Sequence, residues 1–280
     1  MATLASKQNR AAPVVSSAHS SHGRVTSTLI AILSLLRVLC LVFAIRPGTP
    51  LRAMCLAAFD MLHVLRRGSR LSLSRLQTLS ELLNLGANAN AVFDGKRASP
   101  DSIDDIRAQL PVPQHTAVPG DYLSELESLE RRRPSPGGNA INHRAAQLYR
   151  ESVVRVSLGM LATVSFDLPS LQTGIEATRR DHDLAIIFCI VMLCQIIDDV
   201  VDYSGDLASA LPSFLTAHAS LEEGLTQTTL AATEYHRELP ESACLSPFRL
   251  AASLLAAFAS ISLTAGLCRT RLSRLFSVGC

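Results

Sequence analysis

A short acidic stretch, residues 195–206, most constrains what this 280-residue chain can fold into. It follows an unbroken apolar run at residues 184–194, and an apolar run of that length indicates a helix buried in a large core. Gln195, Asp198, Asp199 and Asp202 then stand at i, i+3, i+4 and i+7. On a helix this spacing puts all four side chains on one face, and Asp206 continues that face about one turn later.

Such a face needs a physical reason to exist. Carboxylates stacked on one side of a helix repel one another, and removing them from water is costly. A bound cation is the usual reason, because Mg²⁺ takes one or two carboxylates and completes its shell with water and phosphate oxygens. The alternative is an acidic, solvated helix end, as most charge clusters are. The apolar approach and Gln195 favour the metal site.

The stretch resembles the second aspartate-rich motif of the trans-polyprenyl diphosphate synthases, which reads roughly F-Q-I-x-D-D-x-L-D-Y-x-G-D. Cys194 replaces the Phe and Val201 replaces the Leu, while the other fixed positions agree. The same region is similar to the Q-x-x-x-x-x-D-x-x-x-D element of the squalene and phytoene synthases, which share the fold. The resemblance covers about a dozen residues and implies a bundle of roughly ten helices around a central apolar cavity.

Composition favours an all-α chain. Strand signals are few: there is no clear period-two alternation and no Asn-Gly hairpin turn. The seven cysteines lack CxxC spacing, which favours buried thiols in a reducing, cytoplasmic environment over a disulfide frame or a zinc site. The chain has no basic stripe with interleaved aromatic residues, so we expect no nucleic-acid partner.

We expect one domain preceded by a leader. Residues 1–24 are Ser/Ala-rich without an acidic residue and are interpreted as disordered, whereas residues 25–280 form a single all-α domain with Pro-rich mobile loops at about 111–138. The apolar segment 25–45 is interpreted as the first core helix; a membrane anchor and a targeting segment are the alternatives, and Arg37 argues against a span. Residues 250–267 fit a closing core helix or a thin span. Peripheral membrane association and a homodimer stay open.

A partner for the acidic face is expected at the end of the amphipathic segment 72–92. The related synthases carry a first DDxxD there, whereas this chain has Asn90 and Asp94 at i, i+4. Amide oxygens ligate Mg²⁺ in the Asn-containing motifs of terpene synthases, so the resemblance implies a second metal face here. The same residues also satisfy the rules for a helix end, with Gly95 as the stop, and both interpretations stay open.

The resemblance further implies a transferase or lyase that ionises an allylic prenyl diphosphate with more than one Mg²⁺ ion. Such a catalyst stabilises the departing diphosphate and keeps the carbocation away from water. Gln195 would orient metal-bound water or the carboxylates. The expected catalytic residues are Gln195, Asp198, Asp199 and Asp202. The expected metal ligands are Asn90, Asp94, Asp198, Asp199, Asp202 and Asp206. The expected diphosphate contacts are Lys96, Arg97, Arg155, Arg179 and Arg180.

Three functions stay open. The first is the active Mg²⁺-dependent isoprenoid synthase; the low aromatic content, 5% with no Trp, then favours a linear product or a condensation over cyclisation. The second is a non-catalytic or regulatory member of the same fold, favoured by the missing first DDxxD and by the absence of any Lys after Lys96. The third is a membrane-embedded prenyltransferase-like protein, favoured by the apolar segments 25–45 and 250–267.

Overall fold

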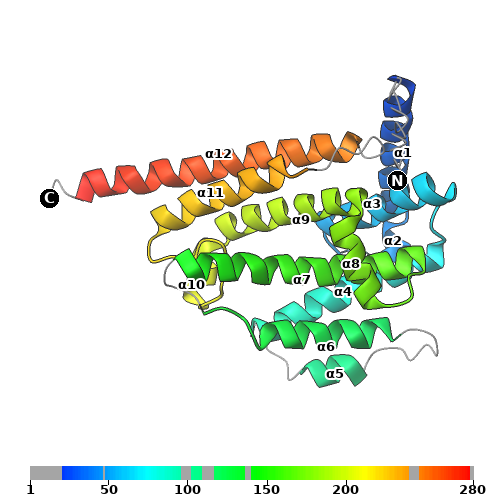
Figure 1. Cartoon of the computed structure of the whole chain (residues 1–280), viewed down its shortest axis with the longest axis horizontal. Helices are drawn as coiled ribbons and strands as arrows, with labels where there is room; N and C mark the ends of the chain where they lie inside the picture. Colours follow the sequence, from blue (N-terminus) through cyan, green and yellow to red (C-terminus); the bar gives the residue numbers. More distant parts are fainter. Residues whose placement is uncertain are drawn as a thin grey trace, which may run out of the picture.

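The computed structural model describes residues 21–46, 48–95, 102–108, 117–135, 140–239 and 246–277. Over these residues the chain forms twelve helices and no strand, which confirms the all-α prediction (Figure 1). The first helix begins at Ser21 rather than at the expected Val25. The rest of the expected leader, Lys96 and Arg97 lie outside the described residues, as do 111–116 and 136–138 of the stretch expected to form Pro-rich mobile loops. The middle of that stretch forms a helix, Val118–Glu130.

The helices follow one another along the chain without an intervening sheet. Their bounds are α1 (Ser21–Cys40), α2 (Val42–Ile45), α3 (Pro50–Arg67), α4 (Leu73–Phe93), α5 (Ile103–Ala108), α6 (Val118–Glu130), α7 (Ala140–Phe166), α8 (Leu171–Arg180), α9 (His182–Val201), α10 (Tyr203–Ala208), α11 (Leu221–Arg237) and α12 (Ser246–Ser277).

Side-chain caps fix where several of these helices begin. Ser72 accepts a hydrogen bond from the Arg75 amide at the start of α4, and Ser220 does the same for Glu223 at the start of α11. Asp181 accepts from two amides at the start of α9, and its charge also suits the positive end of the helix dipole. The long apolar helix α9 is therefore started by a polar residue that the sequence places immediately before it.

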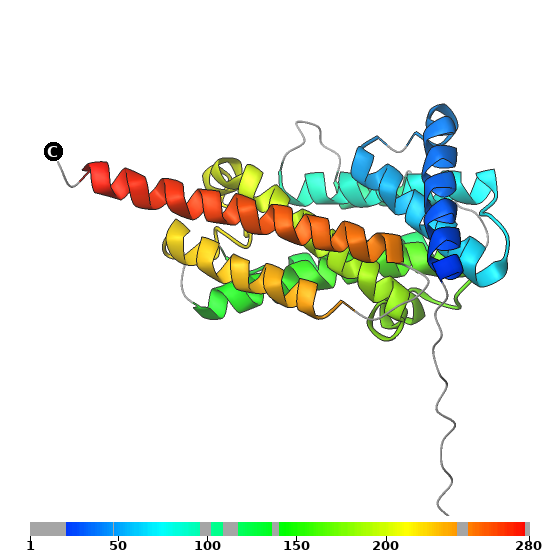
Figure 2. The same ribbon diagram turned by 90° about the horizontal axis from the view of Figure 1, so that it is seen from above.

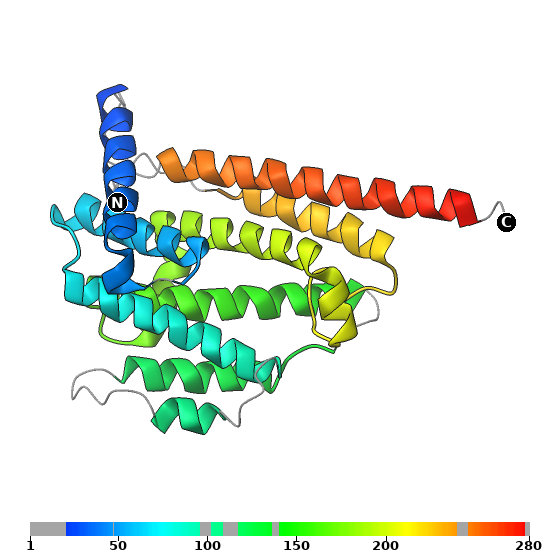
Figure 3. The same cartoon turned by 180° about the vertical axis from the view of Figure 1, so that it is seen from behind.

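Helix α9 lies at the centre of the molecule. In Figures 1 and 3 it runs between α7 on one side and the antiparallel pair α11 and α12 on the other, with α4 and α6 beyond α7. Helix α1 stands across the end of this layered arrangement and packs on α3, as the view from above also shows (Figure 2). The core around α9 is apolar, and Ile186, Met192 and Ile196 of this helix are fully buried.

Two glycines let α7 and α8 approach closely. The chain turns by 105° between these helices. A Cβ on Gly159 would stand 2.7 Å from the Ile175 backbone nitrogen, and a Cβ on Gly174 would meet the carbonyl oxygen of Gly159. Any larger residue at either position must push the two helices apart. This contact fixes one end of α7, the helix that carries much of the candidate site described below.

The one charge in the apolar part of α1, Arg37, points into the protein. Its guanidinium is 2.6 Å from Asp60 of α3, a carboxylate with no exposed surface, which Arg70 and the Leu71 amide also contact. A buried carboxylate needs such partners, because an unpaired charge in the interior is very costly. Arg37 thus makes α1 part of the fold rather than a detached helix.

Only one described helix, α9, is long and apolar enough by itself to cross a membrane; the bent pair α7 and α8 would count as another if taken as one span. Because 56% of the apolar window of α9 is buried, the helix fits a core position equally well. The two segments singled out in the sequence yield shorter apolar helices, Thr26–Cys40 and Ala251–Gly266. Length and hydropathy therefore give only weak support for a membrane span.

Candidate active site

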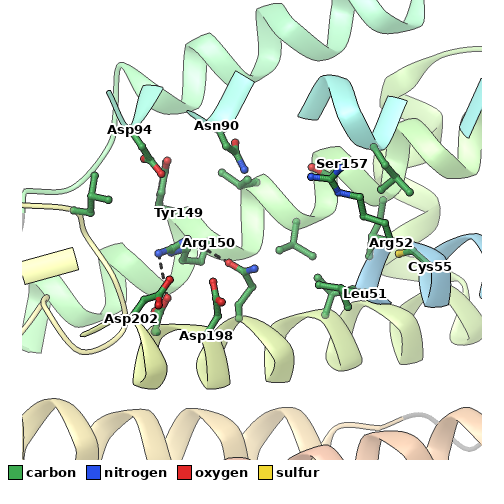
Figure 4. A pocket seen from close by; sticks show the side chains of 18 of the residues that line it. Leu51, Arg52, Cys55, Asn90, Asp94, Tyr149, Arg150, Ser157, Asp198 and Asp202 are labelled. Carbon is green, nitrogen blue, oxygen red and sulfur yellow. Dashed lines mark hydrogen bonds and ion pairs between the residues drawn. The ribbon is translucent and has the colours of Figure 1, made fainter. Parts of the chain in front are cut away.

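A cavity of about 300 Å³ lies between α3, α4, α7 and α9 (Figure 4). Its size is at the lower end of the range found for small-molecule sites, which is roughly 300–1,000 Å³. The cavity brings together the two expected metal faces from opposite sides. The α4 side contributes Asn90 and Asp94, and the α9 side contributes Gln195, Asp198, Asp199, Asp202 and Asp206.

The acidic face continues across a break between two helices. Helix α9 ends at Val201, and Asp202 leaves helical geometry with ψ near 7° before α10 begins. The hydrogen-bond ladder nonetheless continues, because the Asp202 amide donates to the Asp198 carbonyl at 2.8 Å and the Asp206 amide donates to the Asp202 carbonyl at 3.0 Å. The spacing that predicts one face therefore holds, although the single expected helix is divided in two.

The four carboxylates of this face differ in exposure. Asp198 and Asp202 are exposed, whereas Asp199 is 2% exposed and Asp206 is 7% exposed. One Asp199 oxygen accepts from the Phe214 amide at 2.7 Å, and the other lies 3.2 Å from Arg150. Burial raises the pKa of Asp199 to about 6, although Arg150 and the Phe214 amide oppose the rise. Asp199 is thus committed to protein donors, and Asp198 and Asp202 are the better metal ligands.

Arg150 of α7 organises the back of the acidic face. It donates to the Gln195 side-chain oxygen, to Asp199 and to the Pro212 carbonyl, each at 3.2 Å. Gln195, expected to orient metal-bound water or carboxylates, is itself oriented by this guanidinium. Sequence reasoning missed Arg150, but a signal existed: it shares one face of α7 with Val153, Val154 and Ser157, which also line the cavity.

The α4 side carries its own cation. Arg133, which follows α6, lies 2.7 Å from Asp94 and 3.2 Å from Glu130, and it donates to the Phe93 carbonyl. The Tyr149 hydroxyl donates to Glu130, and burial raises the pKa of this phenol. Asp94 is also the C-cap of α4, and its amide donates to the Asn90 carbonyl. The same residue therefore ends the helix and lines the cavity.

A third cation, Arg52 of α3, enters the cavity wall from another side. It donates to the Asn84 side-chain oxygen at 2.5 Å, and the ion pairs of the described residues do not include it. In Figure 4 it stands across the cavity from Asp198 and Asp202, near Ser157 and Cys55. A guanidinium held by an amide keeps its full charge for an incoming anion. No sequence signal singled out Arg52, because its position depends on how α3 packs.

The cations expected to bind diphosphate do not line the cavity where the structure describes them. Arg155 donates to the Thr178 carbonyl at 3.0 Å and stands 3.7 Å above the Phe188 ring, and burial lowers its pKa. Arg179 and Arg180 both pair with Glu176 on the exposed side of α8. Lys96 and Arg97 lie outside the described residues. The structure therefore offers Arg52, Arg133 and Arg150 at the cavity instead.

Away from the carboxylates the cavity wall becomes apolar. Tyr149 is the one aromatic residue among the described residues that line it. The aliphatic and thiol part of the wall consists of Leu51, Cys55, Leu83, Val153, Val154, Leu158, Leu161, Val191 and Leu211. A ligand that fits this gradient has an anionic head and a hydrocarbon body.

The donor chemistry of the site fits Mg²⁺. Asp198, Asp202 and Asn90 offer oxygen donors, which a hard cation prefers, and the described residues that line the cavity include no histidine. Within the described part of the chain, no three His, Cys, Asp or Glu side chains converge closely enough to hold a metal by themselves. Mg²⁺ does not require such a cage, because it binds through one or two carboxylates together with water and substrate phosphates.

Comparison with known proteins identified no relative of this chain. No protein-family model, no curated protein and no solved structure matches the chain.

Proposed function

We propose that this protein is a Mg²⁺-dependent isoprenoid synthase that ionises an allylic prenyl diphosphate. One observation carries the proposal: two polar faces from segments far apart in the chain, one with Asn90 and Asp94 and one with Asp198 and Asp202, line a single cavity whose remaining wall is apolar. The sequence resemblance at residues 195–206 supports the same reaction class. An isoprenoid-synthase-like helical bundle is the fold that goes with this function.

The residues divide the chemical work between the two parts of the cavity. Mg²⁺ would be held mainly by Asp198 and Asp202, with Asp206 beside them and with Asn90 and Asp94 on the opposite side. When bound, the ion neutralises charge on a departing diphosphate. Arg52 and Arg150 would contact the phosphate oxygens. The aliphatic wall formed by Leu158, Leu161 and Val191 would hold the prenyl chain and keep water from the carbocation.

The reaction needs few groups besides these. Breaking the carbon–oxygen bond sends the electron pair to the diphosphate and leaves an allylic cation in the apolar part of the cavity. Stabilisation of charge on the leaving group is the dominant requirement for such a step. The near absence of aromatic residues from the cavity wall supports a linear product or a condensation, because cyclases use aromatic rings to stabilise cations.

Direct assay tests the proposal. The purified full chain is incubated with dimethylallyl, geranyl, farnesyl or geranylgeranyl diphosphate, with and without isopentenyl diphosphate, and with Mg²⁺ or with a chelator. We expect pyrophosphate release and an organic product that require Mg²⁺. Asp198→Ala should abolish both while the circular dichroism spectrum stays unchanged. No release from any substrate, or full turnover by Asp198→Ala, contradicts the proposal.

A second candidate is a non-catalytic member of the same fold that binds a prenyl diphosphate. The observation that favours it is internal neutralisation: Arg133 already pairs with Asp94, and Arg150 already pairs with Asp199. A chain of this kind would bind a non-hydrolysable prenyl diphosphate analogue in calorimetry and would release no pyrophosphate. Among the described helices, the membrane-embedded alternative draws on α9 and, if taken as one span, on the bent pair α7 and α8; α9 also fits a core position.

A further inference from the structure

The first and last helices expose apolar stripes that the rest of the protein does not cover. On α1 the exposed side chains follow helical spacing at Leu29, Ile32, Leu33, Leu36 and Leu39. The next helix, α2, begins with exposed Val42 and with Phe43, which is 90% exposed. On α12 they are Leu254, Phe258 and Ile261. In Figure 1 α12 lies along the top of the molecule, and in Figure 2, seen from above, it crosses in front of the other helices, with α1 at one end. The two helices contact each other.

The outward side of α1 is apolar because its charge is turned inward. Arg37 is the one charged residue between positions 26 and 45, and it pairs with the buried Asp60. The exposed surface of this helix therefore presents hydrocarbon over four turns or so. Monomeric soluble proteins rarely leave contiguous apolar patches of this kind without a partner.

Positive and negative residues are unevenly distributed along the chain, and the terminal segments differ from the centre. All 24 acidic residues lie between Asp60 and Glu241. The segments outside this range, which contain α1 and all of α12, carry ten Lys and Arg residues and no carboxylate side chain, whereas the range itself holds 16 cations. The terminal segments thus sum to +10 and the central range to −8. Two of the ten terminal cations do not face outward, because Arg37 pairs with buried Asp60 and Arg52 lines the cavity of the candidate active site. The elements with exposed apolar stripes are those that carry only positive charge.

A recess opens between these elements. It has a volume of about 200 Å³ and lies between α1, α3, α9 and α12, with a wall of Ile32, Leu35, Met54, Ile187 and Ala251 among other apolar residues. It shares Leu51, Cys55 and Val191 with the cavity of the candidate active site. An uncharged recess at this place suits a hydrocarbon chain rather than a polar ligand.

We propose that α1 and α12 form a docking surface for an anionic lipid bilayer. Apolar side chains enter the boundary between headgroups and acyl chains, while the cations of the terminal segments attract acidic headgroups. A second copy of this chain is a poorer occupant, because two surfaces of the same positive sign repel each other. The recess then faces the lipid and receives a chain from it. The proposal stands independently of the proposed catalytic activity.

Co-sedimentation with vesicles tests the surface. The full chain is mixed with vesicles of phosphatidylcholine alone or of phosphatidylcholine with phosphatidylglycerol. We expect binding to the anionic vesicles that weakens as salt is added. Leu33→Glu with Leu36→Glu should weaken this binding at least about tenfold, since each places a charge in the apolar boundary. Leu148→Glu on α7 is the matched control, because Leu148 is 46% exposed against 51% for Leu36, and it should bind as the wild type does.

The charge component has its own variants. Arg46→Gln and Arg249→Gln leave the apolar stripes intact, and each should weaken binding to anionic vesicles about fivefold. Circular dichroism and thermal unfolding of every variant separate loss of binding from loss of fold.

Three outcomes overturn the proposal. One is an absence of vesicle binding by the wild type, and another is equal loss in the Leu148→Glu control. The third is a wild-type dimer in analytical ultracentrifugation that the Leu33→Glu and Leu36→Glu changes dissociate, with no vesicle binding by either form. That result assigns the surface to a second copy of the chain.

Discussion

The two polar sides of the cavity are built differently. The α9–α10 side carries four carboxylates on a continuous hydrogen-bond ladder, and Arg150 contacts the one that is most buried. The α4 side carries one carboxylate, Asp94, and Arg133 lies 2.7 Å from it. The first side thus brings four carboxylates to the cavity, whereas the single carboxylate of the second side has a cation 2.7 Å away. If the cavity binds Mg²⁺ as proposed, we expect the α9–α10 side to supply most of the ligands and α4 to have a supporting role.

The largest expected effect compares carboxylates across the cavity. Changing Asp198→Asn with Asp202→Asn should lower Mg²⁺-dependent turnover of an allylic diphosphate about 10³-fold or more, because both ligands of the exposed pair are lost. Asp94→Asn should lower turnover about tenfold or less, since Arg133 already reduces the charge of that carboxylate. Initial rates of pyrophosphate release give both numbers. Equal losses on the two sides would remove the asymmetry.

The second comparison is between the two arginines and concerns stability. Arg150→Met leaves the buried Asp199 without its cation and should cost about 3–5 kcal/mol in the free energy of unfolding. Arg133→Met removes the cation from Asp94 and Glu130, which are partly solvated, and should cost about 1 kcal/mol in the free energy of unfolding. Urea denaturation measures both. Adding Asp199→Asn to Arg150→Met should restore much of the loss, and an additive further loss would show that Arg150 does not act through Asp199.

The third test concerns a buried histidine pair next to the segment that contacts Asp199. His143 of α7 and His218 meet at 2.7 Å, and His218 ends the segment 211–218, in which the Phe214 amide donates to Asp199. Burial lowers the pKa of both imidazoles; His218 and then Arg144 lower that of His143 further, while Glu223 raises that of His218.

The sign of the pH effect follows from these shifts. A histidine whose folded-state pKa is lowered contributes stability that is present above its unfolded value, 6.5, and is lost as the pH falls below it. The histidine pair should therefore lower the melting temperature of the wild type below about pH 6.5. Asp199 acts in the opposite direction, because its raised pKa of about 6 stabilises the folded state as the pH falls. His218→Gln should flatten that drop. An identical acid profile in the variant would exclude the pair as its source.

The smallest expected effect lies on the α4 side. Tyr149→Phe removes the hydroxyl that donates to Glu130 but keeps the ring beneath Arg133. The expected cost is about 1 kcal/mol in the free energy of unfolding, with turnover changed by no more than a few-fold. A much larger loss of turnover would mean that the α4 side takes a direct part in the chemistry.

Sequence could predict what depends on local periodicity. The spacing of Asp198, Asp199 and Asp202 predicts that they share one face of a helix. The polar residues around Asp94 predict the end of another helix, and in the structure this end lines the cavity. The cations could not be placed in the same way, because Arg150 meets Asp199 from 49 positions away and Arg133 meets Asp94 from 39. The Arg179 and Arg180 interpretation overlooked a local signal: Glu176 stands three and four positions earlier, a spacing typical of surface ion pairs.

The pair between Arg37 and Asp60 has a mechanical consequence. If α1 were pulled away from α3, a carboxylate without exposed surface would lose one of its cations while still enclosed. That separation would cost about 3–5 kcal/mol, and the leucines of α1 are already exposed without it, so α1 stays attached when it meets another surface. The protein would therefore approach such a surface as a rigid body whose orientation α1 sets, and the recess beside α1 would always face the same way.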